Sequence, residues 1–110
     1  MNQQTTRDLP IACDLSALDA EVRSTHMEAA KQLLNAGAQE IQELPNGLAF
    51  RYTAEQYAQV TQFIANERRC CPFFTFVLEV TPANGPIWLR ITGRDGVKDF
   101  LQSELRSCAC

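Results

Sequence analysis

The sequence predicts a single α+β domain over residues 1–110, with helices packed on one face of a mostly antiparallel sheet of four or five strands. Three observations favour this class: two segments with helical apolar spacing, two strand–turn–strand patterns, and strong turn signals between them. The expected order is β-α-β-β-α-β-β-α. Helix, strand, turn and strand follow one another twice, in residues 17–52 and 54–92, as an internal duplication would produce.

The first half of the chain predicts a lead-in strand, a helix and a hairpin. Residues 9–15 are short and apolar enough for an edge strand or an extended lead-in. Ser16 and Asp19 resemble a capping box that opens a helix, and Gly37 ends it. The turn at residues 45–47 then joins two strands that end at Tyr52. The residues expected on one helical face are Leu18, Val22, Ala29, Ala30, Leu33 and Leu34.

The second half repeats this order and adds a final helix. Thr53 and Gln56 form a second capping-box pattern, and Pro72 disfavours helical geometry at the residue before it, so this helix ends near residue 70. The alternating apolar residues of 74–80 predict a central strand, and a turn at 82–86 leads into a returning strand. A last helix follows from Val97. Residues 1–8 are expected to be flexible, and residues 107–110 form a cysteine-containing tail.

Charge and composition exclude several classes of protein. The chain has 10 basic and 13 acidic residues, a net charge of −3, whereas nucleic-acid binding normally requires a basic patch. The N-terminal residues lack an apolar export signal, and the apolar runs are too short to span a membrane. We therefore expect a cytoplasmic protein that binds neither nucleic acid nor membranes by this chain alone. Five cysteines, an odd number in such a setting, favour reduced thiols over a disulfide framework.

Two adjacent cysteines, Cys70 and Cys71, stand where a helix must stop and a strand must begin. A vicinal pair can present two sulfurs to one ion, and thiolates select soft or borderline metals such as Cu(I), Zn(II) and Hg(II). Thiol redox or nucleophilic chemistry and a purely structural role are the alternatives. The helix C-terminus raises the pKa of thiols near it, whereas Arg68 and Arg69 lower it.

The remaining cysteines have two readings each. Cys13 is either a core residue or a third thiol beside the pair. Cys108 and Cys110 are either part of a dispensable tail or a mobile arm that exchanges metal with the pair, and they could complete a four-thiolate site.

Two other residues are weaker candidates for chemistry. His26 has no histidine or cysteine at metal-ligand spacing around it, which favours a surface or core role over a ligand role. Glu67 could accept a thiol proton, although an ion pair with a neighbouring arginine is the commoner outcome.

Several motifs resemble those of one protein family. The stretch Glu67-Arg68-Arg69-Cys70-Cys71-Pro72-Phe73-Phe74, together with the segments 85–93 and 96–100, is similar to a family of small uncharacterised bacterial proteins. These proteins resemble others associated with mercury or heavy-metal resistance loci, and some are attached to a mercury-responsive type of regulator. The resemblance implies a setting in metal resistance.

Taken together, these patterns predict cytoplasmic, thiolate-based binding of a soft heavy-metal ion in metal resistance or homeostasis. The ion would be Hg(II), Cu(I), Zn(II) or a metalloid, bound by Cys70 and Cys71 with Cys13, and a protein partner in metal handling could take part. One alternative is a cysteine-dependent enzyme that acts on an organometal or disulfide, with Glu67 moving a proton. Another is a sensing or interaction module for a regulator.

Overall fold

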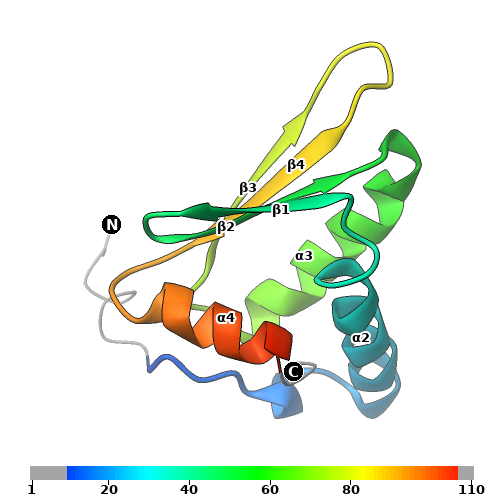
Figure 1. Cartoon of the computed structure of the whole chain (residues 1–110). Coiled ribbons are helices and arrows are strands. Elements are labelled where there is room, and N and C mark those ends of the chain that lie inside the picture. The colour runs from blue at the N-terminus through cyan, green and yellow to red at the C-terminus, as the bar shows by residue number, and fades with distance from the viewer. Residues whose placement is uncertain (1–9, 107–110) are drawn as a thin grey trace, which may run out of the picture.

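The computed structural model describes residues 10–106 as a four-stranded antiparallel sheet with helices on one face (Figure 1). The α+β class is therefore confirmed. In chain order, the elements are the 3-10 helix η1 (Leu15–Ala17), α2 (Ala20–Leu33), β1 (Glu40–Leu44), β2 (Gly47–Tyr52), the 3-10 helix η2 (Ala54–Gln56), α3 (Tyr57–Cys70), β3 (Thr75–Val80), β4 (Ile87–Thr92) and α4 (Val97–Arg106).

The strands lie in the order β1-β2-β4-β3, so the second strand of each hairpin occupies the centre of the sheet. Phe50 of β2 pairs with Leu89 of β4, and Leu89 pairs in turn with Leu78 of β3. The prediction that residues 74–80 form a central strand is wrong, because β3 lies at an edge. The residues of β3 that point away from the helices remain exposed. The order of the strands depends on pairing between the two hairpins, which the apolar pattern of a single strand does not reveal.

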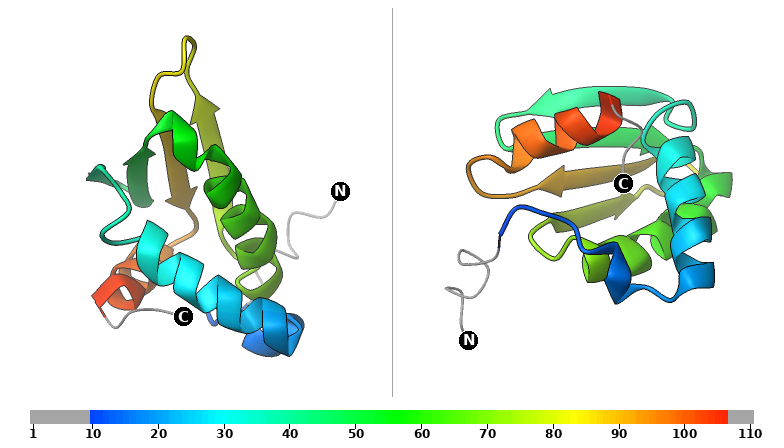
Figure 2. Two further views of the ribbon diagram at one scale, coloured as in Figure 1. Left: turned by 90° about the vertical axis from the view of Figure 1, so that its right-hand side faces the viewer. Right: turned by 90° about the horizontal axis from the view of Figure 1, so that it is seen from below.

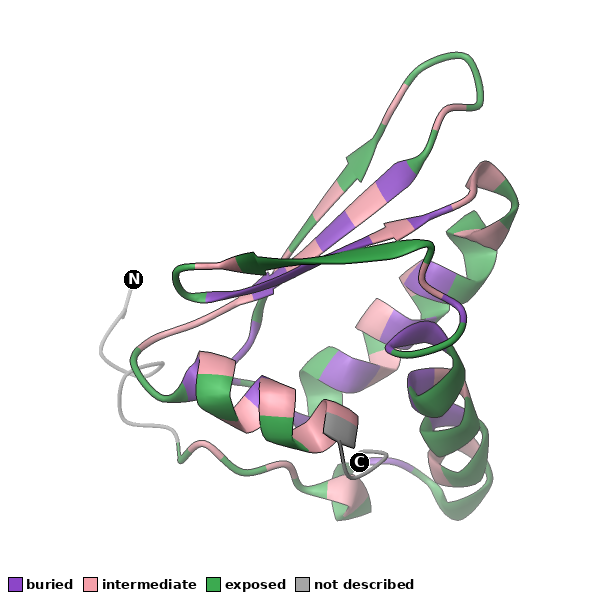
Figure 3. Ribbon diagram, in the orientation of Figure 1, coloured by how far each residue is buried: buried purple, intermediate pink, exposed green. Residues whose placement is uncertain are grey.

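The helices cover one side of the sheet, as the two views of Figure 2 show. Helix α2 packs against α3, and α4 packs against β2. Along β4 the residues alternate between buried and half-exposed, which is the pattern of a sheet with one covered face. Figure 3 shows this alternation on the strand. The buried residues of β4 are Ile87, Leu89 and Ile91.

The predicted leading strand does not form in the described part of the segment, residues 10–14, so the sheet has four strands. This segment is instead attached to the end of α3, where the backbone N–H of Asp14 donates to the carbonyl of Cys70 at 2.7 Å. A single such bond fixes the position of the segment without extending the ladder of the sheet. The lead-in thus crosses the C-terminal end of α3.

Capping explains where the helices begin and end. The box predicted at Thr53 and Gln56 is confirmed, and α3 ends at Cys70 as Pro72 requires. The box predicted at Ser16 and Asp19 is wrong: the side chain of Asp14 accepts from the backbone N–H of Ser16, so a separate 3-10 turn precedes α2.

Some sequence predictions fall on residues that the structure does not describe. The predicted flexibility of residues 1–8 falls outside the described range. The predicted roles of Cys108 and Cys110 in the tail 107–110 fall outside it as well. Within residues 10–106, the helices are all too short or too polar to cross a membrane.

Candidate functional site

The candidate site lies where the buried faces of α2 and α3 meet. The buried residues of α3 recur at helical spacing, and the last two of them are Glu67 and Cys70. The buried face of α2 includes His26. Each helix therefore places a residue with an ionisable side chain on its otherwise apolar stripe, facing the other helix. The fully buried residues that precede them on the α3 stripe are Val60 and Phe63.

His26 and Glu67 form a buried pair between these helices. The Nε2 atom of His26 lies 2.6 Å from Oε1 of Glu67, and their side chains are 0% and 5% exposed. The imidazole stacks on the ring of Phe63, with centroids 5.4 Å apart. The other ring nitrogen, Nδ1, is buried and has no hydrogen-bond partner among the residues that the structure describes. Two residues of α3, Phe63 and Glu67, thus both contact the imidazole of His26.

Cys70 completes a cluster with this pair. Its Sγ lies 3.8 Å from Oε1 of Glu67 and 3.7 Å from the backbone carbonyl oxygen of the same residue. The ligand atoms of His26, Glu67 and Cys70 all lie within 4.8 Å of one another, and all three residues are buried. A nitrogen, an oxygen and a sulfur donor therefore converge on one point inside the protein.

Two further sulfur atoms, those of Cys13 and Cys71, lie next to this cluster. Cys13 and Cys71 form a disulfide, and Sγ of Cys70 lies 3.7 Å from Sγ of Cys71. The hydrogen bond between the backbone N–H of Asp14 and the carbonyl of Cys70 brings the lead-in segment to this position. The expectation of reduced cysteines is therefore wrong for Cys13 and Cys71 in this structure. Their Cα atoms are 4.4 Å apart, within the range for a disulfide.

The electrostatics of the cluster favour a charged imidazole. Burial by itself lowers the pKa of His26, but hydrogen bonds to Cys70 and Glu67 and the negative charge of those side chains raise it from 6.5 to about 9. The imidazolium and the Glu67 carboxylate compensate each other's charge, which a buried site requires.

This raised pKa predicts that the metal-free protein loses stability as the pH rises from 6.5 to 9. In that window, folded His26 retains a proton that the unfolded chain has released, so the free energy of unfolding falls by up to about 1.4 kcal/mol per pH unit. The contribution is complete below pH 6.5. Urea unfolding between pH 6 and 9, with a chelator present, measures the slope.

Two variants separate His26 from the nearby thiol in this measurement. His26→Gln is expected to abolish most of the slope, whereas Cys70→Ser, which removes one of the contacts that raise the pKa of His26, is expected to reduce the slope without abolishing it. A wild-type free energy of unfolding that stays level across the window would contradict the assignment of the proton to His26.

The structure brings together some of the predicted residues and separates others. Cys13 lies beside the vicinal cysteines, as one of its two readings required, and Glu67 points to them along α3. Glu67 is buried and pairs with His26, whereas an ion pair with a neighbouring arginine was the commoner expectation. Arg69 instead donates to the backbone carbonyl of Ala17.

His26 is the functional residue that sequence reasoning undervalued. Its position four residues before Ala30 and seven before Leu33 places it on the buried stripe of α2. Glu67 stands likewise on the stripe of α3, four residues after Phe63. One basic and one acidic side chain on two stripes that must pack together would have predicted the pair.

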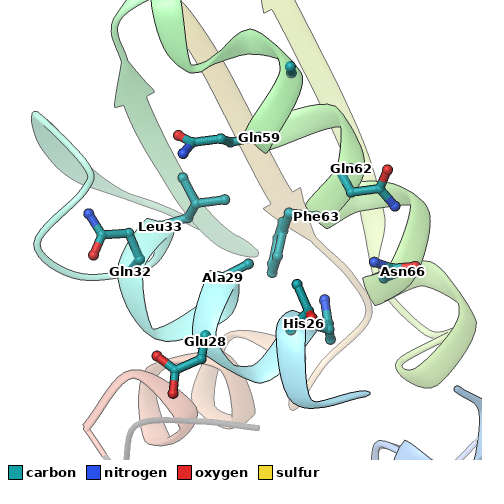
Figure 4. A pocket seen from close by; sticks show the side chains of 11 residues that line it. His26, Glu28, Ala29, Gln32, Leu33, Gln59, Gln62, Phe63 and Asn66 are labelled. Atoms are coloured by element: carbon teal, nitrogen blue, oxygen red, sulfur yellow. The ribbon is translucent and has the colours of Figure 1, made fainter. Parts of the chain in front are cut away.

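A cleft of about 610 Å³ opens between α2 and α3 on the other side of His26. Figure 4 shows the side chains that line it, which come from both helices. Its polar lining consists largely of amides, and Phe63 and Leu33 supply apolar surface. His26 belongs both to this cleft and to the buried cluster. The amides are those of Gln32, Gln59, Gln62 and Asn66.

Comparison with known proteins found no matching family model and no significant match among curated proteins or solved structures. The chemistry of the site must therefore be argued from its own residues.

Proposed function

We propose that the protein binds a soft heavy-metal ion through the thiolates of Cys70 and Cys71, with Cys13 as the third sulfur ligand. Hg(II) is the ion we favour, with Cu(I), Zn(II) or a metalloid as further cargo. The observation that carries the proposal is the gathering of three sulfurs from two distant parts of the chain at the C-terminal end of α3. The resemblance of the motif around the pair to proteins of metal-resistance loci supports the same function.

The spacing of the sulfurs bears on the coordination number. With metal–sulfur bonds of about 2.3 Å, two sulfurs lie about 4.6 Å apart in a linear site, about 4.0 Å in a trigonal one and about 3.8 Å in a tetrahedral one. The Sγ atoms of Cys70 and Cys71 are 3.7 Å apart. This separation, which belongs to the disulfide form, is close to that expected for a three- or four-coordinate ion with the bond lengths of Zn(II).

Metal binding of this kind requires reduction of the disulfide. While Cys71 is bonded to Cys13, neither sulfur is a thiolate. We propose that the protein acts in the cytoplasm, where a disulfide is usually transient. Reduction then releases the thiols of Cys13 and Cys71, which join Cys70 to give three sulfur ligands, and oxidation withdraws those two.

Titration of the reduced protein with Hg(II) in the presence of a competing thiol tests the proposal. The double variant Cys70→Ser/Cys71→Ser is expected to lose more than about 100-fold in affinity, since even an outer-shell partner often contributes about 10- to 100-fold. Parallel titrations with Cu(I), Zn(II) and arsenite establish which ion binds most tightly.

The matched control is Cys108→Ser/Cys110→Ser, which removes the same number of thiols from the tail. Truncation after Arg106 removes the tail itself. If affinity falls equally in both double variants, or is unchanged when Cys70 and Cys71 are replaced, the assigned site is wrong.

A cysteine-dependent enzyme is the second candidate, because the His26–Glu67 pair lies next to Cys70. The carboxylate of Glu67 would accept the proton of a thiol that attacks an organometal or a disulfide. Turnover of such a substrate by the reduced wild type, and its loss in Cys70→Ser and Glu67→Gln, would favour catalysis over binding alone.

A further inference from the structure

We infer that His26, Glu67 and Cys70 form a second kind of metal site, for a borderline divalent ion such as Zn(II) or Co(II), that is present while the Cys13–Cys71 disulfide is intact. This site uses a nitrogen, an oxygen and a sulfur donor in place of sulfurs alone. It shares Cys70 with the proposed soft-metal site and requires neither Cys13 nor Cys71.

The donor set suits Zn(II) and ions like it. Imidazole, carboxylate and thiolate are the ligands that proteins use for Zn(II), and three protein ligands leave one coordination position open. Hg(II) and Cu(I), in contrast, select sulfur. With one thiolate and one carboxylate, a divalent ion makes an electrically neutral group, which limits the cost of its burial.

Two of the three ligand separations are compatible with this site after a small adjustment, and the third, between a ring nitrogen of His26 and Sγ of Cys70, is at most 4.8 Å. A tetrahedral ion with bonds of about 2.0–2.3 Å places a sulfur and an oxygen ligand about 3.6 Å apart, and a nitrogen and an oxygen ligand about 3.4 Å apart. Sγ of Cys70 and Oε1 of Glu67 are 3.8 Å apart. Nε2 of His26 and Oε1 of Glu67, at 2.6 Å, must separate by less than 1 Å as the ion replaces the proton between them.

The surroundings position all three donors. Phe63 stacks on the imidazole, and Glu67 and Cys70 are one helical turn apart in the last turn of α3. Helices α2 and α3 pack against each other, and Cys13 and Cys71 lie outside both of them. The site therefore has a preformed geometry in the oxidised protein.

Co(II) titration of the oxidised protein tests this inference, because Co(II) reports its ligands through visible and near-ultraviolet absorption. We expect one equivalent to bind with the spectrum of a four-coordinate ion and a sulfur-to-cobalt charge-transfer band. Zn(II) should displace it. Cys70→Ser should abolish the charge-transfer band, and His26→Gln and Glu67→Gln should each weaken binding by at least about 10-fold.

Two controls make the outcome decisive. Glu28→Gln, the same substitution at an exposed position of α2, should leave Co(II) binding unchanged. Cys13→Ser/Cys71→Ser should also retain it, which excludes binding to the vicinal pair in a reduced fraction. Circular dichroism establishes that each variant is folded, and Cys70→Ser alone decides the question if the His26 variant does not fold.

Absence of Co(II) absorption in the disulfide form, or an unchanged spectrum in folded Cys70→Ser, would overturn the inference. These results are independent of Hg(II) binding by the reduced protein. Loss of the Co(II) site would leave the soft-metal proposal standing, and loss of Hg(II) affinity would leave the Co(II) result intact.

Discussion

Glu67→Ala is expected to destabilise the protein by about 3–5 kcal/mol at neutral pH, as is typical when one partner of a buried ion pair is removed. Glu67 is 3% exposed and holds the proton-bearing Nε2 of His26 at 2.6 Å. Without the carboxylate, His26 must either remain charged in an apolar environment or release its proton. Urea or thermal unfolding of the two proteins measures the difference.

A double-variant cycle identifies the origin of this loss. Glu28→Ala, on the exposed side of α2, should change the free energy of unfolding by less than about 0.5 kcal/mol. Replacing both members of the pair by apolar residues, as in His26→Leu/Glu67→Leu, should destabilise less than the sum of the two single changes. If Glu67→Ala and Glu28→Ala lower the free energy of unfolding equally, the His26–Glu67 pair does not stabilise the fold.

This energetic pattern bears on function as well as stability. A buried ion pair is weak evidence for stability, because well-packed apolar residues of similar size often serve as well or better. The presence of His26 and Glu67 on two otherwise apolar stripes is therefore more easily explained by a chemical role. Their contact with Cys70 gives that role a location.

The local features of the fold could be predicted from the sequence because their signals are local. The Thr53–Gln56 capping box, the end of α3 before Pro72 and the two hairpins each depend on residues a few positions apart. Strand order was not predicted, since β2 and β4 are joined by backbone pairing between separate hairpins. The lead-in also failed as a strand because its contacts are made with the end of α3.

In the candidate site, too, the local features could be predicted from the sequence and the long-range contacts could not. The junction that carries Cys70 and Cys71 was predicted from Pro72 and the apolar pattern around it. The partners were harder: His26 is 41 positions from Glu67, and Cys13 is 58 positions from Cys71. Spacing within one helix does not reveal contacts of this kind. An ionisable residue on the apolar stripe of one helix does, however, predict a partner of opposite charge on the stripe of the helix that packs against it.

Reduction of the Cys13–Cys71 disulfide is expected to lower the free energy of unfolding by about 4 kcal/mol, the loop-entropy value for a separation of 58 residues. The bond joins the N-terminal lead-in to the end of α3, so its loss enlarges the ensemble of unfolded conformations. Urea unfolding with and without a phosphine reductant measures the change. Cys13→Ser should already have the lower stability and should not respond to the reductant, whereas Cys108→Ser/Cys110→Ser should respond like the wild type.

The same measurement connects the disulfide to metal binding. An ion that binds only the folded state stabilises it by about 4 kcal/mol at 1,000 times its Kd, which is close to the loss expected on reduction. Hg(II) bound by Cys13, Cys70 and Cys71 would also join the same two segments that the disulfide joins. The reduced protein saturated with Hg(II) should therefore regain most of the lost stability, and the Cys70→Ser/Cys71→Ser variant should not. If the reduced wild type is no more stable with Hg(II) than without it, the three sulfurs do not act together as a metal site.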